Sequence, residues 1–194
     1  MTFIASASKR AMLAGATCLV ILSGMIAGHA WPLWTGRVVT MKVVPVDPRD
    51  LFRGEYVHLD TPASQLYREG ASVAPSPTLS VVRPVDRVFE DSRRGSVVYV
   101  QLAQSPSGDY LPVSASRDRV LGALNLRGRV KYKSGASMLN VEYGLDAFYM
   151  QEGTGKRVEQ AIRQPGNVQM QVAIGSSGQA RIKTLLVNGV PVER

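Results

Sequence analysis

Residues 11–30 carry no formal charge, and they follow directly on Lys9 and Arg10. A helix of about 20 apolar residues spans the hydrocarbon core of a bilayer. The two tryptophans of the chain, Trp31 and Trp34, come just after this stretch, where aromatic rings favour the membrane interface. The sequence therefore predicts a transmembrane anchor at residues 11–30, with the lipid bilayer as its partner.

A cleaved signal peptide is the main alternative to this anchor. The stretch is rich in Ala and Gly, and Gly-His-Ala at residues 28–30 fits a cleavage site between small residues. However, the stretch is longer than the roughly 7 to 15 apolar residues of a signal peptide, which favours a retained signal-anchor. A buried helix of a soluble protein is a further alternative. Because Lys9 and Arg10 are the nearest charges, we expect residues 1–10 to form a cytoplasmic tail.

The composition limits what the remaining residues do. The chain is 45% hydrophobic and 20% charged, which is typical of a folded protein. Its net charge of +8 is dispersed and it has four phenylalanines, so we expect no nucleic acid as a partner. A basic exterior instead indicates proximity to anionic lipid or acidic envelope polymers. The single cysteine, Cys18, lies in the apolar stretch, so we predict no disulfide, no metal site and no cofactor.

Beyond Trp34 the chain alternates apolar and polar residues and is rich in β-branched side chains. This pattern predicts strands at residues 37–46, 96–104, 124–133, 168–174 and 180–187. Turn signals separate the strands, at residues 105–108, 133–135, 175–178 and 188–189. Residues 71–78, with two prolines, predict an irregular connection.

One stretch, residues 154–164, has helical spacing, and Pro165 and Gly166 close it. The predicted fold class is therefore mainly β. It has an N-terminal transmembrane helix followed by an antiparallel β domain at residues 35–194, with one short helix near 154–164.

An ungapped similarity relates residues 98–108 to residues 168–178, with Gln, Ala, Ser and Gly at matching positions. A duplication would explain it and would divide the domain into two related β lobes, at residues 35–120 and 121–194. The alternative is that two β-hairpins share the chemistry of their turns.

Residues 44–59 are the densest charged and aromatic stretch outside the anchor. Asp47 and Pro48 favour a turn, and Gly54 supports a positive φ before the next strand. We therefore predict a strand, turn and strand that expose a binding surface, made by Asp47, Arg49, Asp50, Arg53, Glu55 and Tyr56. The alternative is a structural corner whose charges pair with one another and with backbone groups.

Residues 48–53 read Pro-Arg-Asp-Leu-Phe-Arg, and residues 54–61 read Gly-Glu-Tyr-Val-His-Leu-Asp-Thr. Later stretches read Tyr-Gly-Leu-Asp-Ala-Phe-Tyr at residues 143–149 and Ala-Arg-Ile-Lys-Thr-Leu-Leu-Val-Asn-Gly at residues 180–189. In this order the stretches resemble the GDYXXLXY protein family, membrane-anchored bacterial proteins of unknown function. In the motif that names the family, Glu55 stands for Asp and Thr61 for the final Tyr.

The resemblance implies an N-terminal span, an outward-facing domain and an integral-membrane neighbour, and it brings no catalytic residues. The stretch from residue 143 adds three candidate binding residues, Tyr143, Tyr149 and Glu152. The alternative is that these tyrosines hydrogen-bond across a loop while neighbouring apolar side chains fill the core.

No catalytic constellation is evident in the sequence. A triad has two histidines available, His29 at the membrane boundary and His58 on a predicted strand. A Ser-Lys type hydrolase would need a serine before the turn, yet residues 35–61 contain none. We therefore predict a protein without enzymatic activity.

The predicted function is that of a periplasmic accessory protein, held single-pass and N-in in the bacterial cytoplasmic (inner) membrane. Its domain would dock on an integral-membrane partner, which the anchor keeps at high effective concentration. An alternative is a binding module for an anionic envelope ligand, read by Arg49 and Arg53. A Ser-Lys type hydrolase is the less favoured third possibility.

Overall fold

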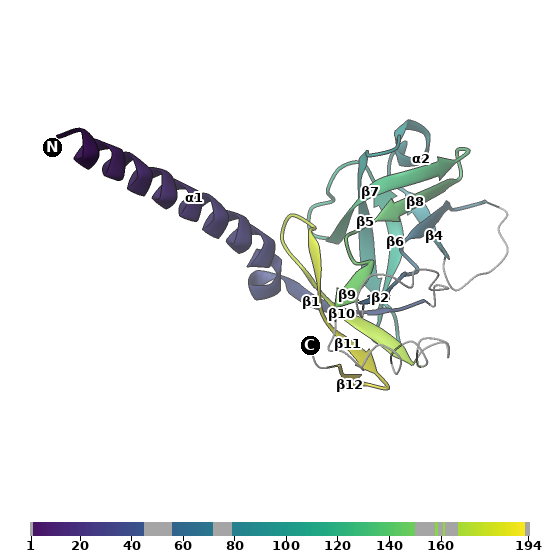
Figure 1. Ribbon diagram of the computed structural model, residues 1–194. Helices are drawn as coiled ribbons and strands as arrows, with labels where there is room; N and C mark the ends of the chain where they lie inside the picture. Colours follow the sequence, from purple (N-terminus) through teal and green to yellow (C-terminus); the bar gives the residue numbers. More distant parts are fainter. Residues whose placement is uncertain are drawn as a thin grey trace.

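The computed structural model describes residues 2–44, 56–71, 79–149, 158, 161 and 167–192. The fold is mainly β, as the sequence predicts, and it begins with one long helix, α1 (Thr2–Thr35). A second helix, α2 (Val88–Asp91), has a single turn. Figure 1 shows α1 projecting away from the β domain.

The helix α1 includes one stretch, Lys9–Thr35, that is long and apolar enough to cross a membrane. The domain covers none of its most apolar part. Side chains such as Leu13 and Val20 are more than 70% exposed, which argues against a core helix of a soluble protein. The predicted anchor at residues 11–30 lies within this helix, and a signal sequence near the N-terminus meets the same criteria of length and composition.

Six strands close a barrel in the order β3-β4-β6-β5-β7-β8. Closure leaves no strand edge open to another chain. Most neighbours are antiparallel, but β4 runs parallel to both β3 and β6, which the sequence did not predict. The strands are β3 (Gln65–Arg68), β4 (Leu79–Pro84), β5 (Val97–Gln104), β6 (Tyr110–Ser116), β7 (Leu124–Ser134) and β8 (Met138–Glu142).

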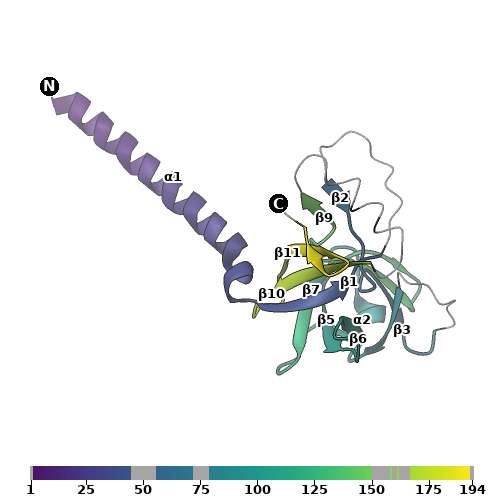
Figure 2. The ribbon, with the colours of Figure 1, turned by 90° about the horizontal axis from the view of Figure 1, so that it is seen from below.

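A four-stranded sheet in the order β1-β10-β11-β12 lies beside the barrel and next to α1 (Figure 2). Its strands are β1 (Arg37–Lys42), β10 (Val168–Ile174), β11 (Ala180–Val187) and β12 (Val190–Pro191). A separate pair joins β2 (Tyr56–His58) to β9 (Ala147–Tyr149). The barrel takes strands from both sides of residue 120, and the division into two lobes there stays a prediction.

The five strands predicted from the alternating pattern are confirmed as β1, β5, β7, β10 and β11, and β1 ends four residues early. The four predicted turns each connect two paired strands. The predicted helix near 154–164 lies outside the described residues, apart from Val158 and Ala161, which are both helical. Most of the irregular connection at 71–78 also lies outside them.

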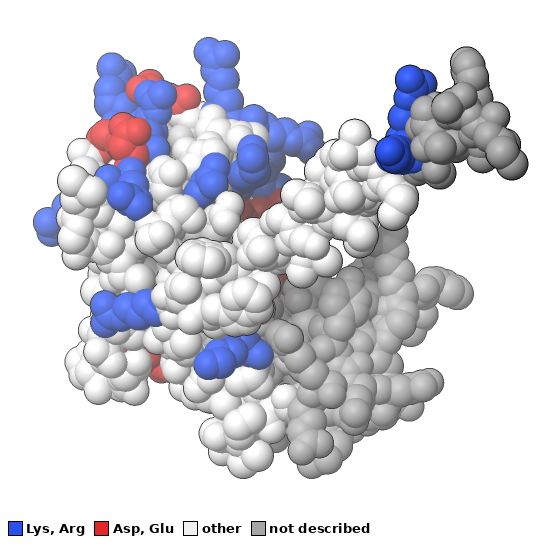
Figure 3. Space-filling view, turned by 90° about the vertical axis from the view of Figure 1, so that its left-hand side faces the viewer, with Lys and Arg blue, Asp and Glu red and all other residues white. Residues whose placement is uncertain are grey.

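Several polar contacts join the sheet to the barrel. Asp109, which is 3% exposed, accepts a hydrogen bond from Gln169 Nε2 at 2.8 Å and lies 3.7 Å from Lys42 Nζ. Arg37 donates to the Tyr110 hydroxyl at 2.8 Å. Figure 3 views the domain from the side of α1 and shows Lys and Arg over this face, with Asp and Glu in fewer places.

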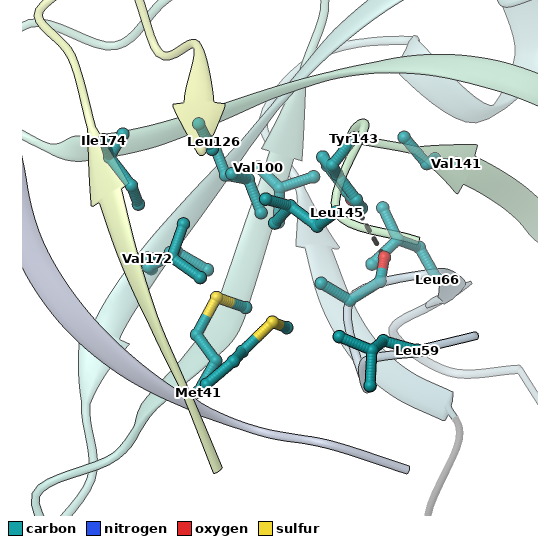
Figure 4. Packing of buried hydrophobic residues seen from close by; sticks show 14 of the residues in the cluster. Met41, Leu59, Leu66, Val100, Leu126, Val141, Tyr143, Leu145, Val172 and Ile174 are labelled. Atoms are coloured by element: carbon teal, nitrogen blue, oxygen red, sulfur yellow. Dashed lines mark hydrogen bonds between the residues drawn. The ribbon is translucent and has the colours of Figure 1, made fainter. Parts of the chain in front are cut away.

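One hydrophobic core runs through both sheets (Figure 4). Met41 and Val172 come from the four-stranded sheet, whereas Val100 and Leu126 come from the barrel, and all four are buried. Alternation along β1 buries Val39 and Met41, whereas Val38 and Lys42 are exposed and Thr40 is half-buried, as expected for a strand with one covered face. The sheet and the barrel therefore pack as one domain.

Candidate functional site

Two stretches that the sequence marks as separate candidates meet in one pair of strands. β2 lies near the end of the charged stretch of residues 44–59, and β9 lies within residues 143–153, the stretch that contains Tyr143, Tyr149 and Glu152. The two strands are antiparallel, with Tyr56 opposite Tyr149. The pairing makes neighbours of two segments that are far apart in the chain.

The two ends of the charged stretch meet at one point of the domain. Val44 forms an antiparallel bridge with Asp60, and the Val44 N–H donates to the Asp60 carbonyl oxygen at 2.9 Å. The N–H of Leu59, which is buried, donates to the Asp146 carbonyl oxygen at 2.8 Å. These bonds fix the two ends of the stretch, and they place Asp60 and Asp146 at the start of one shared surface.

A tight turn follows, and Thr61 organises it. The Thr61 N–H donates to Asp60 Oδ1 at 2.8 Å, and Thr61 Oγ1 accepts from the Ala63 N–H at 3.2 Å. The Ser64 N–H donates to the Thr61 carbonyl oxygen at 2.9 Å. Thr61 is 2% exposed, so this departure from the resembled motif lies at a buried turn position.

Tyr143 packs beneath this turn (Figure 4). Its hydroxyl donates to the Ala63 carbonyl oxygen at 2.8 Å. Burial of the hydroxyl, with a smaller contribution from the charge of Asp60, raises the pKa of Tyr143 well above its ordinary value of 10.0. The side chain therefore stays protonated and acts as a donor that joins the motif stretch from residue 143 to the turn after residue 61.

A pocket of about 120 Å³ opens between the turn, the strands β7 and β8, and the segment that leads from β8 to β9. Its charged lining consists of Asp60, Glu142, Asp146 and Lys131. Three carboxylates against one ammonium group favour a cationic or neutral polar group over an anion. The remaining lining residues are Leu59, Thr61, Ser64, Asn140, Val141, Tyr143 and Leu145.

The family model described as GDYXXLXY protein matches residues 18–185, from the middle of α1 to β11. The chain belongs to the GDYXXLXY protein family. Comparison with curated proteins and with solved structures found no match. The GDYXXLXY motif of this chain, residues 54–61, thus runs from before β2 to the turn above Tyr143.

The structure describes some of the predicted binding residues, and others lie outside the described residues. Tyr56, on β2 and within the GDYXXLXY motif, stands opposite Tyr149 on β9. Tyr143 is buried with its hydroxyl engaged, as the structural alternative expects. The other six lie outside the described residues: Asp47, Arg49, Asp50, Arg53, Glu55 and Glu152.

A Ser-Lys type hydrolase would need a serine hydroxyl bonded to a lysine side chain, and the pocket contains one residue of each kind. Ser64 and Lys131 both line the pocket, but Lys131 is exposed and Ser64 Oγ lies 3.4 Å from the Thr61 N–H. In the described part of the chain, no hydrogen bond joins a serine hydroxyl to a lysine or histidine side chain. Within the same residues, no group of three or more His, Cys, Asp and Glu side chains is placed to hold a metal ion.

Sequence analysis did not single out Asp60, Glu142 and Lys131, three of the charged residues that rim the pocket. Asp60 lies inside the GDYXXLXY motif and Asp146 lies inside the second motif stretch, so motif position alone marks both. Glu142 and Lys131 come from β8 and β7, and only the pairing of these strands brings them to the motif. The register between distant strands was the missing information.

Proposed function

We propose that this GDYXXLXY protein is a membrane-anchored, non-enzymatic accessory protein that docks on an integral-membrane partner. The observation that carries the proposal is the pairing of β2 with β9, which joins two motif stretches of the family around one exposed rim. Exposed polar side chains gathered from separate motifs are expected of a recognition surface.

The anchor supports this choice of partner. α1 is long and apolar enough to span a bilayer, and it would confine the domain to the membrane surface. Confinement raises the effective concentration of the domain near other membrane proteins. Lys9 and Arg10, on the short N-terminal side, favour an N-in orientation in the inner membrane with the domain in the periplasm.

A binding module for an anionic envelope ligand is the alternative function. Its proposed contacts, Arg49 and Arg53, lie outside the described residues. The described pocket gives it little support, because Asp60, Glu142 and Asp146 would repel an anion there.

Site-specific photocrosslinking in native membranes tests the proposed docking. A photoreactive side chain would replace Asp146, an exposed residue of the pocket rim, and in a matched control it would replace Arg83, which is 75% exposed on β4. We expect a discrete adduct with one integral-membrane protein from position 146 and none from position 83. Equal adducts from both positions, or none from either, would contradict docking through this surface.

A further inference from the structure

Leu121 lies on the loop between β6 and β7 and is 81% exposed. Among the described residues, no large apolar side chain is more exposed, and Trp34 on α1 reaches 73%. A single exposed leucine is ordinary on a protein surface. Two further properties set Leu121 apart, the way its loop is fixed and the place where the loop lies.

The loop, residues 117–123, is held from inside by Asn125, which is 6% exposed. Asn125 Nδ2 donates to the carbonyl oxygens of Val120 and Ala123, both at 2.8 Å, and Asn125 Oδ1 accepts from the Val120 N–H at 3.1 Å. The backbone on each side of Leu121 is thus tied to the barrel. The loop presents the leucine outward instead of folding it onto the domain.

The loop lies against the turn between β10 and β11. Arg119 Nη1 donates to the Ser176 carbonyl oxygen at 2.5 Å, and the Arg127 N–H donates to the Gly178 carbonyl oxygen at 2.8 Å. The same turn contacts the end of α1, where Pro32 is buried beside Gly175. Figures 1 and 2 show the four-stranded sheet beside this end of the helix.

The connection from α1 to the domain leaves no linker. Gly36 alone separates Thr35, the last residue of α1, from β1, and its N–H donates to the Pro32 carbonyl oxygen at 2.9 Å. A Cβ atom at Gly36 would lie 2.2 Å from that oxygen and 3.0 Å from the backbone of Ile174, so only glycine fits. A helix that spans the bilayer therefore holds the adjoining loop at the bilayer surface.

We propose that residues 117–123 form a second contact with the bilayer, in which Leu121 enters the headgroup region beside the end of α1. This contact rests on the proposed anchor. Its occupant is a phospholipid surface because the loop contacts the β10–β11 turn, which itself contacts the end of α1, where Trp31 and Trp34 are exposed as expected of interfacial residues. Arg37 and Arg119, both exposed at this end of the domain, suit anionic headgroups.

The test is an environment-sensitive fluorophore on single cysteines of the full chain, reconstituted in vesicles of phosphatidylcholine and phosphatidylglycerol. In a Cys18→Ala background, Leu121→Cys carries the label. The matched control is Ser134→Cys, at the other end of β7 and about 33 Å along the strand. The native chain, labelled at Cys18 within α1, reports on the anchor itself.

We expect the label at position 121 to emit at shorter wavelength than the label at position 134. Quenching by lipids with a nitroxide near the headgroup should be about twofold stronger at position 121 than at position 134. If position 121 is aqueous while Cys18 is in lipid, the loop contact is wrong and the anchor stands. If Cys18 is also aqueous, the anchor itself has failed.

Discussion

The two hairpins related by sequence similarity, β5–β6 and β10–β11, have the same local structure. Each carries a register shift at the same aligned place, between Gln101 and Leu102 in one and between Gln171 and Val172 in the other. Their turns close alike, with Ser105 N–H bonded to the Asp109 carbonyl at 2.8 Å and an equivalent bond of 2.9 Å in the second turn. The shared bulge extends the similarity beyond turn chemistry.

Their surroundings differ. Both β5 and β10 are paired on two sides, but β5 lies inside the closed barrel, whereas β10 lies in an open sheet that contacts α1. The turn of the first hairpin is open around Gly108, but Gly178 of the second is packed against the strand β7. The comparison teaches that similar sequences give the two hairpins the same bulge and turn. The strands and helix packed around each hairpin then determine its contribution to the fold.

The largest expected contrast is between Gly178→Ala and Gly108→Ala. Both glycines have a positive φ, 84° and 88°, which costs an L-residue about 1–2 kcal/mol. At Gly178 the new Cβ would also lie 3.1 Å from the Asn125 carbonyl oxygen, so we expect a total loss of about 3 kcal/mol. Urea unfolding of the full chain in detergent micelles, followed by circular dichroism, measures both. Equal losses would show that the second turn is not packed as described.

The next contrast is between the aligned residues Asp109 and Gln179. Asp109 is buried and bonded to Gln169 and Ser107, whereas Gln179 is exposed. We expect Asp109→Ala to lower the free energy of unfolding by about 2–3 kcal/mol, because it leaves the Gln169 amide without its buried acceptor. Gln179→Ala should stay within about 0.5 kcal/mol. Urea unfolding of both variants tests this prediction. If Asp109→Ala leaves the free energy of unfolding unchanged, the contact of Asp109 between sheet and barrel does not stabilise the fold.

Gln101 and Gln171 give a third matched pair. Gln101 is 5% exposed, and its amide nitrogen donates to Ser116 Oγ at 3.0 Å and to Asn125 Oδ1 at 3.3 Å. Gln171 is half-buried in the open sheet. We expect Gln101→Ala to cost about 2 kcal/mol and Gln171→Ala less than half as much. Thermal unfolding of each variant measures the two losses of stability. A larger loss for Gln171→Ala than for Gln101→Ala would contradict the hydrogen bonds described for Gln101.

Tyr143, next to β7, provides the smallest effect at neutral pH. Tyr143→Phe removes the bond to Ala63 and should cost about 1 kcal/mol at pH 7. Because the folded state raises the pKa of Tyr143, its contribution is complete below pH 10.0 and falls as the pH rises further, when the unfolded chain ionises. Between pH 8 and 11, the free energy of unfolding should therefore fall less steeply with rising pH for Tyr143→Phe than for the native chain. If the free energy of unfolding depends on pH equally in the two proteins, the Tyr143 hydroxyl is in water and not buried.

Long alternating segments made most of the fold predictable. β5, β7, β10 and β11 each have seven or more residues of alternating pattern, enough to define a strand. β2 and β9 have three residues each, too few for a period to show. Parallel pairing of β4 and closure of the barrel depend on registers between distant segments, which local pattern does not contain.

The candidate site was predictable in part for the same reason. The family motifs identified the stretches around Tyr56 and Tyr149, and pairing of β2 with β9 brings them together. Tyr143 stood among the candidate binding residues, yet its hydroxyl is buried against Ala63, and composition alone does not distinguish a buried tyrosine from an exposed one. Asp60 and Asp146 are held in place because their own carbonyl oxygens accept hydrogen bonds from the N–H groups of Val44 and Leu59.

The central claim is that α1 is a retained anchor with the β domain on the outer side of the membrane. Single cysteines Ser8→Cys and Ser134→Cys, each in a Cys18→Ala background, would be exposed to a membrane-impermeant maleimide in spheroplasts. We predict that position 134 is labelled in intact spheroplasts, that position 8 is labelled after lysis alone, and that the membrane-bound chain keeps its N-terminal residues. Labelling of position 8 without lysis, or a released chain shortened near residue 30, would contradict the claim.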